Sequence, residues 1–251
     1  MSPILNVAAY RFVAIADPAA VAEWLRGLAE ARELKGSVLV AAEGINLFLA
    51  GQAKDVHGLM EDLGRDPRFQ GVTPKFSHSD SRPFRRLRVK VKREIISFGG
   101  RTRSADASRA PMVSPMMLRD WLRQGHDDAG RELVLLDTRN QQEVAFGSFK
   151  QAIKLPIDRF TQLPDALESH REALKDKAVV SFCTGGIRCE KAAAWMAEAG
   201  YGDVLQLEGG ILAYFEQVGG EGYEGGCFVF DERVVLDPAL QPMPLDSAAS
   251  A

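Results

Sequence analysis

The sequence predicts two domains, an N-terminal ferredoxin-like βαββαβ domain of the α+β class followed by a parallel α/β domain. Over the first eighty residues, extended runs and amphipathic repeats follow the order strand, helix, strand, strand, helix, strand. Later, apolar runs at 133–137, 178–182 and 203–207 alternate with helical stretches, which is typical of parallel strands with helices on both faces. At 251 residues, 46% hydrophobic and 26% charged, the chain is long enough for two cores.

The first predicted helix has a clear start signal. An extended run at 7–13 is followed by Asp17 and Pro18, which supply a cap and a proline for the first helical position. Apolar residues then recur at helical spacing, at Val21, Trp24, Leu25 and Leu28.

The rest of the first domain continues the pattern. Strands are expected at 37–42 and 47–50, a second amphipathic helix around 56–63, and a fourth strand that contains Phe76. The residues that join the two middle strands are Glu43, Gly44, Ile45 and Asn46. Taken alone, they fit a simple turn and a functional loop equally well.

A basic segment, 82–103, closes the first domain, which we place at 1–104. Residues 82–109 hold ten Lys or Arg and two acidic residues, a net charge of +8, whereas the whole chain carries −3. Residues 87–92 alternate apolar and basic, which predicts a strand with three apolar side chains on one face and three cations on the other. A solvated face is the simpler interpretation, but the charge density and Phe84 favour contact with nucleic-acid phosphates. The candidate RNA-binding residues are Arg85, Arg86, Arg88, Lys90, Lys92 and Arg93.

The second half is expected to hold a linker at 105–113, the α/β domain at 114–220, a return segment at 221–236 and a disordered tail at 237–251. Ser114 and Pro115 predict a helix start and Gly125 its end. Asp137 and Arg139, at the end of a predicted strand, form either a structural ion pair or an orienting group for an active site. We favour the structural ion pair.

Cys183 begins a short loop between a predicted buried strand and an alanine-rich helix. A lone cysteine after an apolar strand is usually a core residue, but Gly185, Gly186 and Arg188 change this interpretation. The glycines allow successive N–H groups to converge, and these groups, the helix dipole and the guanidinium all favour a thiolate. The spacing Cys-x4-Arg gives a smaller loop than a Cys-x5-Arg phosphatase cradle, so we favour sulfur chemistry over phosphate chemistry.

The other thiols and the histidines predict no metal site and no disulfide framework. Three cysteines is an odd number, and the four histidines lack ligand spacing. Cys189 is either a resolving thiol for an oxidised Cys183 or a buried helix residue, and we favour the buried residue. Because no run has membrane-spanning length or signal-peptide character, we expect a cytoplasmic protein.

The second domain resembles a rhodanese domain, and nearly the whole chain resembles the rhodanese-related tRNA uridine hydroxylases. The rhodanese resemblance rests on residues 136–139 and the Cys183 loop, with Glu143, Gly147, Ile153 and Pro156 between them. The narrower resemblance rests on Cys-Thr-Gly-Gly-Ile-Arg-Cys-Glu-Lys at 183–191, Ala-Glu-Gly-Ile-Asn at 42–46 and Cys-Phe-Val-Phe-Asp-Glu-Arg at 227–233.

This resemblance implies a tRNA-modifying oxidoreductase that converts the wobble uridine to 5-hydroxyuridine, with molecular oxygen as co-substrate and no other cofactor evident. It assigns Cys183 as the essential residue and favours a functional loop at Glu43, Gly44 and Asn46. The implied active-site loop comprises Thr184, Gly185, Gly186, Ile187 and Arg188. Asp137, Arg139 and Cys189 are the expected supporting residues.

Two other functions fit part of the sequence. A plain sulfurtransferase would need the Cys183 loop but would leave the basic segment unexplained. A rhodanese-type binding module without catalysis would need neither the thiol nor the glycines and arginine that follow it. The expected partner is therefore tRNA, without a membrane or a metal.

Overall fold

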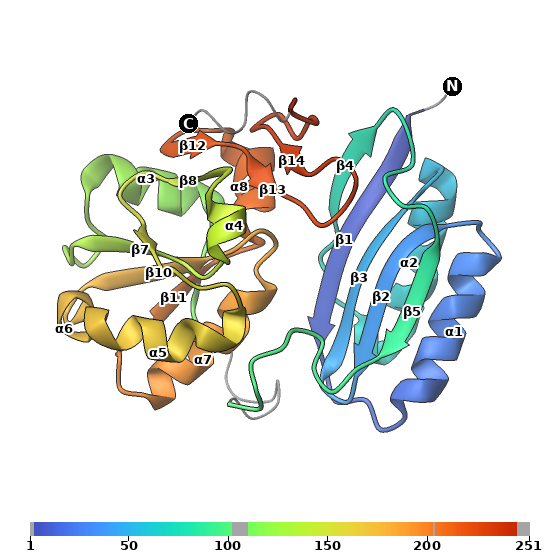
Figure 1. Cartoon of the computed structure of the whole chain (residues 1–251), viewed down its shortest axis with the longest axis horizontal. Helices are drawn as coiled ribbons and strands as arrows, with labels where there is room; N and C mark the ends of the chain where they lie inside the picture. The colour runs from blue at the N-terminus through green and yellow to red at the C-terminus, as the bar shows by residue number, and fades with distance from the viewer. Residues whose placement is uncertain (1–2, 102–109, 203, 245–251) are drawn as a thin grey trace. The chain divides into compact units, whose positions relative to one another are not determined.

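The computed structural model describes residues 3–101, 110–202 and 204–244 and divides the chain into two compact units, 1–107 and 108–251 (Figure 1). The first unit contains β1 (Ile4–Phe12), α1 (Pro18–Glu30), β2 (Lys35–Ala41), β3 (Gly44–Gly51), α2 (Ala53–Arg65), the 3-10 turn η1 (Pro67–Phe69), β4 (Lys75–Ser79) and β5 (Leu87–Val91).

The first unit has the predicted ferredoxin-like arrangement with one added strand. Its sheet has the order β4-β1-β3-β2-β5, in which β5 pairs in parallel with β2 and all other neighbours are antiparallel. Asp17 caps α1 by accepting the N–H of Ala20 at 3.0 Å, as predicted. Apolar residues of α1 and α2, including Leu25 and Leu59, pack with the sheet in one buried core.

The prediction of a loop at 43–46 is wrong for Gly44, Ile45 and Asn46, because β3 begins at Gly44. Gly44 pairs with Phe12 of β1 and has a φ of 145°. A Cβ at this position would lie 2.0 Å from the Arg11 carbonyl oxygen, so only glycine fits. Glu43 and Asn46 both contact the segment after β5. Glu43 Oε1 accepts the N–H of Ile95 at 2.7 Å, and Asn46 Nδ2 donates to the Ile95 carbonyl at 3.4 Å.

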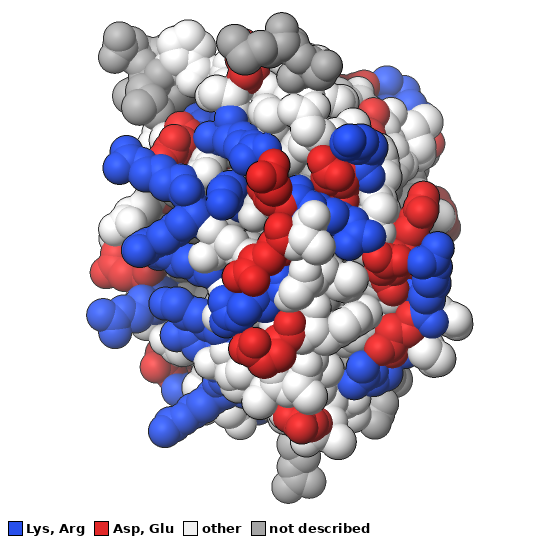
Figure 2. All heavy atoms as spheres, turned by 90° about the vertical axis from the view of Figure 1, so that its right-hand side faces the viewer, with Lys and Arg blue, Asp and Glu red and all other residues white. Residues whose placement is uncertain are grey.

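The edge strand β5 alternates apolar and basic residues as predicted, and its cations are exposed. Val89 is buried and Leu87 half-buried, whereas Val91 is 51% exposed. The strand pairs only with β2, at the edge of the sheet. Lys and Arg side chains also gather along one side of the face shown in Figure 2. All six candidate RNA-binding residues, Arg85, Arg86, Arg88, Lys90, Lys92 and Arg93, are exposed.

The second unit is built on a five-stranded parallel sheet with the order β6-β11-β10-β7-β9. Figure 1 shows α5, α6 and α7 on one side of this sheet and α3 and α8 on the other. Its elements are β6 (Met112–Val113), α3 (Pro115–Gln124), β7 (Leu133–Asp137), α4 (Gln141–Val144), β8 (Gly147–Phe149), β9 (Ile153–Lys154), η2 (Phe160–Gln162), α5 (Leu163–Leu167), η3 (Glu168–His170), α6 (Arg171–Leu174), β10 (Ala178–Phe182), α7 (Ile187–Glu198), β11 (Val204–Leu207), α8 (Gly210–Val218), β12 (Tyr223–Gly225), β13 (Cys227–Phe228) and β14 (Val235–Leu236).

Two predicted connections differ in the structure. The expected linker at 105–113 ends in β6, whose residues pair with β11. Residues 105–109 lie outside the described residues, and so does Arg103 of the basic segment. The return segment is not a single strand, because β12 pairs with β8 and β13 forms a hairpin with β14.

The expectation of a disordered tail at 237–251 is wrong for residues 237–244. Residues 237–244 are ordered: Asp237 Oδ1 accepts the N–H groups of Ala239 and Gln241, and the Met243 N–H donates to the Val235 carbonyl at 3.0 Å. Residues 245–251 lie outside the described residues.

Candidate active site

Cys183 lies directly after β10, at the carboxyl edge of the parallel sheet, and its side chain is fully buried. The residues that follow it make a tight loop into α7. The carbonyls of Cys183 and Thr184 accept the N–H groups of Ile211 and Leu212 at 3.0 and 3.1 Å, which ties the loop to the start of α8. The loop is therefore held from two helices, as a preorganised site requires.

Gly210 explains how α8 approaches the loop so closely. It has a φ of 66°, and a Cβ at this position would lie 2.4 Å from the Cys183 carbonyl oxygen and 2.8 Å from that of Thr184. Only glycine fits at this position.

The loop holds the Cys183 sulfur as a thiolate. Burial alone would raise the pKa of the thiol, but hydrogen bonding from Cys189, the positive charge of Arg188 and the backbone N–H groups of Arg188 and Gly186 outweigh it and lower the pKa to about 5. The Gly186 N–H donates to Cys183 Sγ at 3.1 Å, and its φ of 96° turns the amide into the loop. At neutral pH the group is therefore ionised.

Arg188 contacts a partner that the sequence analysis did not assign. Its Nη1 and Nη2 donate to Glu143 Oε2 and Oε1 at 2.6 and 2.7 Å, and both side chains are buried, at 6% and 3% exposed. The guanidinium is fixed by Glu143 of α4, and its charge lowers the Cys183 pKa. Within the described residues its buried Nε has no hydrogen-bond partner.

Cys189 lies in the first turn of α7 and is fully buried, so the favoured interpretation of a buried helix residue fits its position. Burial and the neighbouring Cys183 raise its pKa well above the usual value for a thiol. Thr138 Oγ1 lies 3.6 Å from Cys189 Sγ and donates to the Phe182 carbonyl at 3.0 Å. Thr138 was not selected from the sequence, because a threonine after a strand gives no chemical signal.

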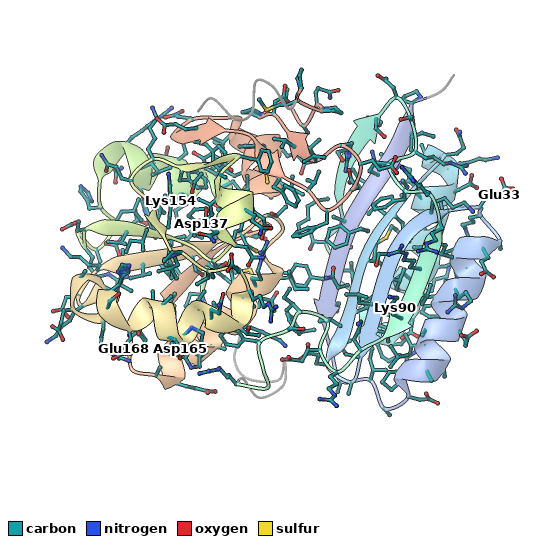
Figure 3. The ribbon with its side chains drawn as sticks, in the orientation of Figure 1. Glu33, Lys90, Asp137, Lys154, Asp165 and Glu168 are labelled. Atoms are coloured by element: carbon teal, nitrogen blue, oxygen red, sulfur yellow. The ribbon has the colours of Figure 1, made fainter. Side chains whose placement is uncertain are left out.

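Asp137 and Arg139 form a fully buried ion pair beneath the loop. Figure 3 labels Asp137, at the end of β7. Arg139 Nη2 donates to Asp137 Oδ2 at 2.6 Å and to the Gly147 carbonyl at 2.7 Å, and Ser148 Oγ donates to Asp137 Oδ2 at 2.8 Å. These bonds join β7 to β8, the arrangement expected of a structural pair.

The remaining loop residues pack inward. Thr184 Oγ1 donates to the Phe228 carbonyl of β13 at 3.3 Å, and Ile187 begins α7 as a buried residue. Gly185 has open space where a Cβ would lie, so its need for glycine is not steric crowding.

The other predicted functional residues belong to the first unit. The basic side chains, of which Figure 3 labels Lys90, lie on or beside β5, and Glu43 and Asn46 hold the segment after it. Among residues 3–101, 110–202 and 204–244, no three His, Cys, Asp or Glu side chains gather as a metal ion would require. In the same residues, no helix combines the length and apolar character needed to cross a membrane.

Two domain-family models match the chain: the UPF0176 acylphosphatase like domain over residues 4–95 and the Rhodanese-like domain over residues 118–217. A protein named tRNA uridine(34) hydroxylase from Xanthomonas euvesicatoria pv. vesicatoria (strain 85-10) is 62% identical over 240 residues, which cover 96% of this chain and 97% of that protein. A protein of the same name from Xylella fastidiosa (strain 9a5c) is 56% identical over 96% of this chain and 93% of its own length.

Solved structures match part of the chain at lower identity. The rhodanese-like domain of a protein from Anabaena sp. is 21% identical and matches 46% of this chain and 79% of that chain, with a TM-score of 0.37.

Proposed function

Because the chain belongs to the family of proteins named tRNA uridine(34) hydroxylase, we propose that it hydroxylates uridine 34 of tRNA at C5, with molecular oxygen as the co-substrate and the Cys183 thiolate as the essential group. The observation that carries the proposal is the state of Cys183. Its pKa is lowered to about 5 in a loop fixed by Gly186, Arg188 and α8, so a nucleophile is present at neutral pH without any external base.

A thiolate can prepare a uracil ring for hydroxylation. Addition of sulfur to C6 makes C5 electron-rich, so that C5 can react with an electrophilic oxygen species. The same sulfur can instead carry a persulfide or a sulfenic acid. In each case the chemistry begins at Cys183 Sγ, and Arg188 stabilises the negative charge that the thiolate carries before it reacts.

The basic residues of the first unit support the choice of tRNA as substrate. The exposed side chains of Arg88 and Lys90 lie on β5, and Arg85, Arg86, Lys92 and Arg93 flank the strand. Cations in a row gain free energy along a phosphate backbone by releasing counterions. A tRNA substrate also supports a cytoplasmic location for the protein.

The proposal predicts that Cys183→Ser abolishes formation of 5-hydroxyuridine and leaves the fold intact. Serine has nearly the size of cysteine, but its hydroxyl is not ionised at neutral pH. Purified protein is incubated with unmodified tRNA and oxygen, and the digested nucleosides are measured by mass spectrometry. Circular dichroism of both proteins controls for folding, and full activity of folded Cys183→Ser would refute the role of Cys183.

A plain sulfurtransferase is the second candidate, favoured by the match of residues 118–217 to the Rhodanese-like domain. In that case the wild-type protein would transfer sulfur from thiosulfate to cyanide through Cys183 and would leave tRNA unchanged. Measuring both activities on one preparation separates the two functions.

A further inference from the structure

The backbone of Gly186 makes hydrogen bonds to both Cys183 and Cys189. The Gly186 N–H donates to Cys183 Sγ at 3.1 Å, and the Gly186 carbonyl accepts the N–H of Cys189, also at 3.1 Å. Both side chains are fully buried. Cys189 Sγ lies 3.6 Å from Thr138 Oγ1, which donates to the carbonyl of Phe182, the residue before Cys183. The loop thus places Cys183 and Cys189, called here the sulfur pair, in one buried region.

The two sulfurs are in different protonation states. Burial and its neighbour raise the pKa of Cys189 well above the usual value, whereas the pKa of Cys183 is lowered to about 5. At neutral pH the pair therefore consists of one thiolate and one thiol. Such a pair forms an intramolecular disulfide when one sulfur is oxidised and the other attacks it, with loss of the thiol proton.

The proposed reaction requires electrons as well as oxygen. Replacing the C5–H bond of uracil by C5–OH uses one atom of O2, and the second atom leaves as water only if two electrons are supplied. Oxidation of two thiols to a disulfide releases two electrons. The two electrons that hydroxylation requires therefore equal the two that oxidation of the sulfur pair releases.

We propose that Cys183 and Cys189 supply these two electrons, so that each hydroxylation converts the thiolate and thiol into a Cys183–Cys189 disulfide. The Cys189 S–H bond breaks and an S–S bond forms. One oxygen atom of O2 enters the C5–H bond, and the other becomes water with the Cys189 proton and one proton from solvent. A thiol reductant then restores the pair for the next turnover. This inference rests on the proposed hydroxylase function and makes Cys189 a catalytic residue.

The third cysteine provides a matched control. Cys227 is also fully buried, and burial raises its pKa to about 12. Its Sγ lies 3.7 Å from the Phe228 carbonyl oxygen, in the β13 strand and not in the loop or α7. Cys227→Ser changes the same atoms in the same unit without touching the sulfur pair.

The first test counts products. Wild-type protein freed of reductant and supplied with tRNA and O2 is expected to make about one 5-hydroxyuridine per protein and then stop, because the pair holds two electrons. Dithiothreitol should restore repeated turnover. Trypsin cleaves after Arg188, so the peptides 178–188 and 189–191 remain joined only when the disulfide is present, and mass spectrometry detects it.

The second test separates electron supply from hydrogen bonding. Cys189→Ser keeps a hydrogen-bond donor beside Cys183 but cannot form a disulfide, so its product should fall below one per protein even with dithiothreitol, while the pH dependence of Cys183 alkylation stays like that of the wild type. Cys227→Ser should match the wild type in both measurements.

Three other results would contradict the inference. Repeated turnover by Cys189→Ser with dithiothreitol, or many products from wild type without reductant, would overturn the inference and leave the hydroxylase function standing. If wild-type protein with dithiothreitol makes no 5-hydroxyuridine at all, the proposed function itself is refuted, and the inference is refuted with it.

Discussion

The two units differ in where they hold ion pairs. In the first unit, Arg88 and Lys90 are exposed, and the pair of Arg26 with Glu23 has side chains 35% and 72% exposed. The second unit also has exposed pairs, such as Lys150 with Glu224, but three of its pairs lie inside. The pairs Arg139–Asp137, Arg188–Glu143 and Arg233–Asp231 have side chains no more than 9% exposed.

This difference follows from what the charges do. Burying an ion pair costs several kcal/mol of desolvation per ion, so such a pair is rarely the most stable solution for a core. In the second unit the buried pairs fix β7, β8, α4 and the first turn of α7 around one thiolate. In the first unit, charges that remain in water stay available to a polyanion, and their cost to the fold is small.

The largest expected effect comes from breaking the most buried pair. Asp137→Ala leaves Arg139 charged and without its partner in the core, so we expect a loss of about 3–5 kcal/mol in the free energy of unfolding. Glu23→Ala breaks the exposed pair of the first unit and should cost less than about 1 kcal/mol. Urea unfolding followed by fluorescence measures both, since Trp121 and Trp195 report on the second unit and Trp24 on the first.

Equal losses in the two variants would contradict the comparison. It would mean that the fully buried pair contributes no more than a surface pair, and that the packing around Arg139 adapts to the missing carboxylate.

The next effect concerns the charge beside the thiolate. Removing Arg188 alone would leave Glu143 buried and unpaired, so the variant to make is Arg188→Met with Glu143→Gln, which neutralises both positions. The pKa of Cys183 is about 5 because stabilising interactions outweigh burial, and loss of the cation should raise it. The rate of alkylation by iodoacetamide follows the thiolate, so its half-maximal pH should move upward.

Arg188→Lys provides the companion measurement. Lysine keeps the charge but cannot make the two parallel bonds to Glu143. We therefore expect the hydroxylation activity to fall while the pKa of the Cys183 thiol changes little. An alkylation profile unchanged in the neutral double variant would show that the backbone N–H groups and Cys189 alone hold the thiolate.

The sequence predicted the order of elements well because apolar periodicity and helix caps are local signals. The spacing in α1, the Ser114 cap and Gly125 of α3 and the strand at 178–182 all depend on neighbours within a few residues. β6 was missed because two residues carry no periodicity, and its strand exists only through pairing with β11.

The site was predicted in its chemistry but not in its partners. The glycines after Cys183 indicated an amide-lined loop, which the Gly186 N–H forms. The Arg188–Glu143 pair joins residues 45 positions apart in the chain, and no local pattern specifies which carboxylate an arginine meets. Gly44 shows the same limit. In the sequence it looks like a turn residue, but glycine is needed there because the paired strand brings the Arg11 carbonyl close.

The smallest effect on the fold is expected at β5. Replacing Arg88, Lys90 and Lys92 together by Gln removes three exposed charges, and surface substitutions of this kind usually change stability by less than about 0.5 kcal/mol each. Under the proposed function, however, affinity for tRNA should fall, and the slope of log affinity against log salt should become shallower by somewhat less than about one unit per lost phosphate contact.

A matched control for charge is Lys150, Lys154 and Lys175 to Gln, three exposed lysines of the second unit. It alters the net charge of the protein by the same amount, so a general electrostatic attraction would weaken tRNA binding equally in both triple variants. If β5 itself contacts phosphates, only the β5 variant should lose salt dependence, while the alkylation rate of Cys183 stays at the wild-type value in both. Unchanged affinity and slope in the β5 variant would show that its cations are an ordinary solvated face, and that the contrast between the two units reflects solubility, not tRNA binding.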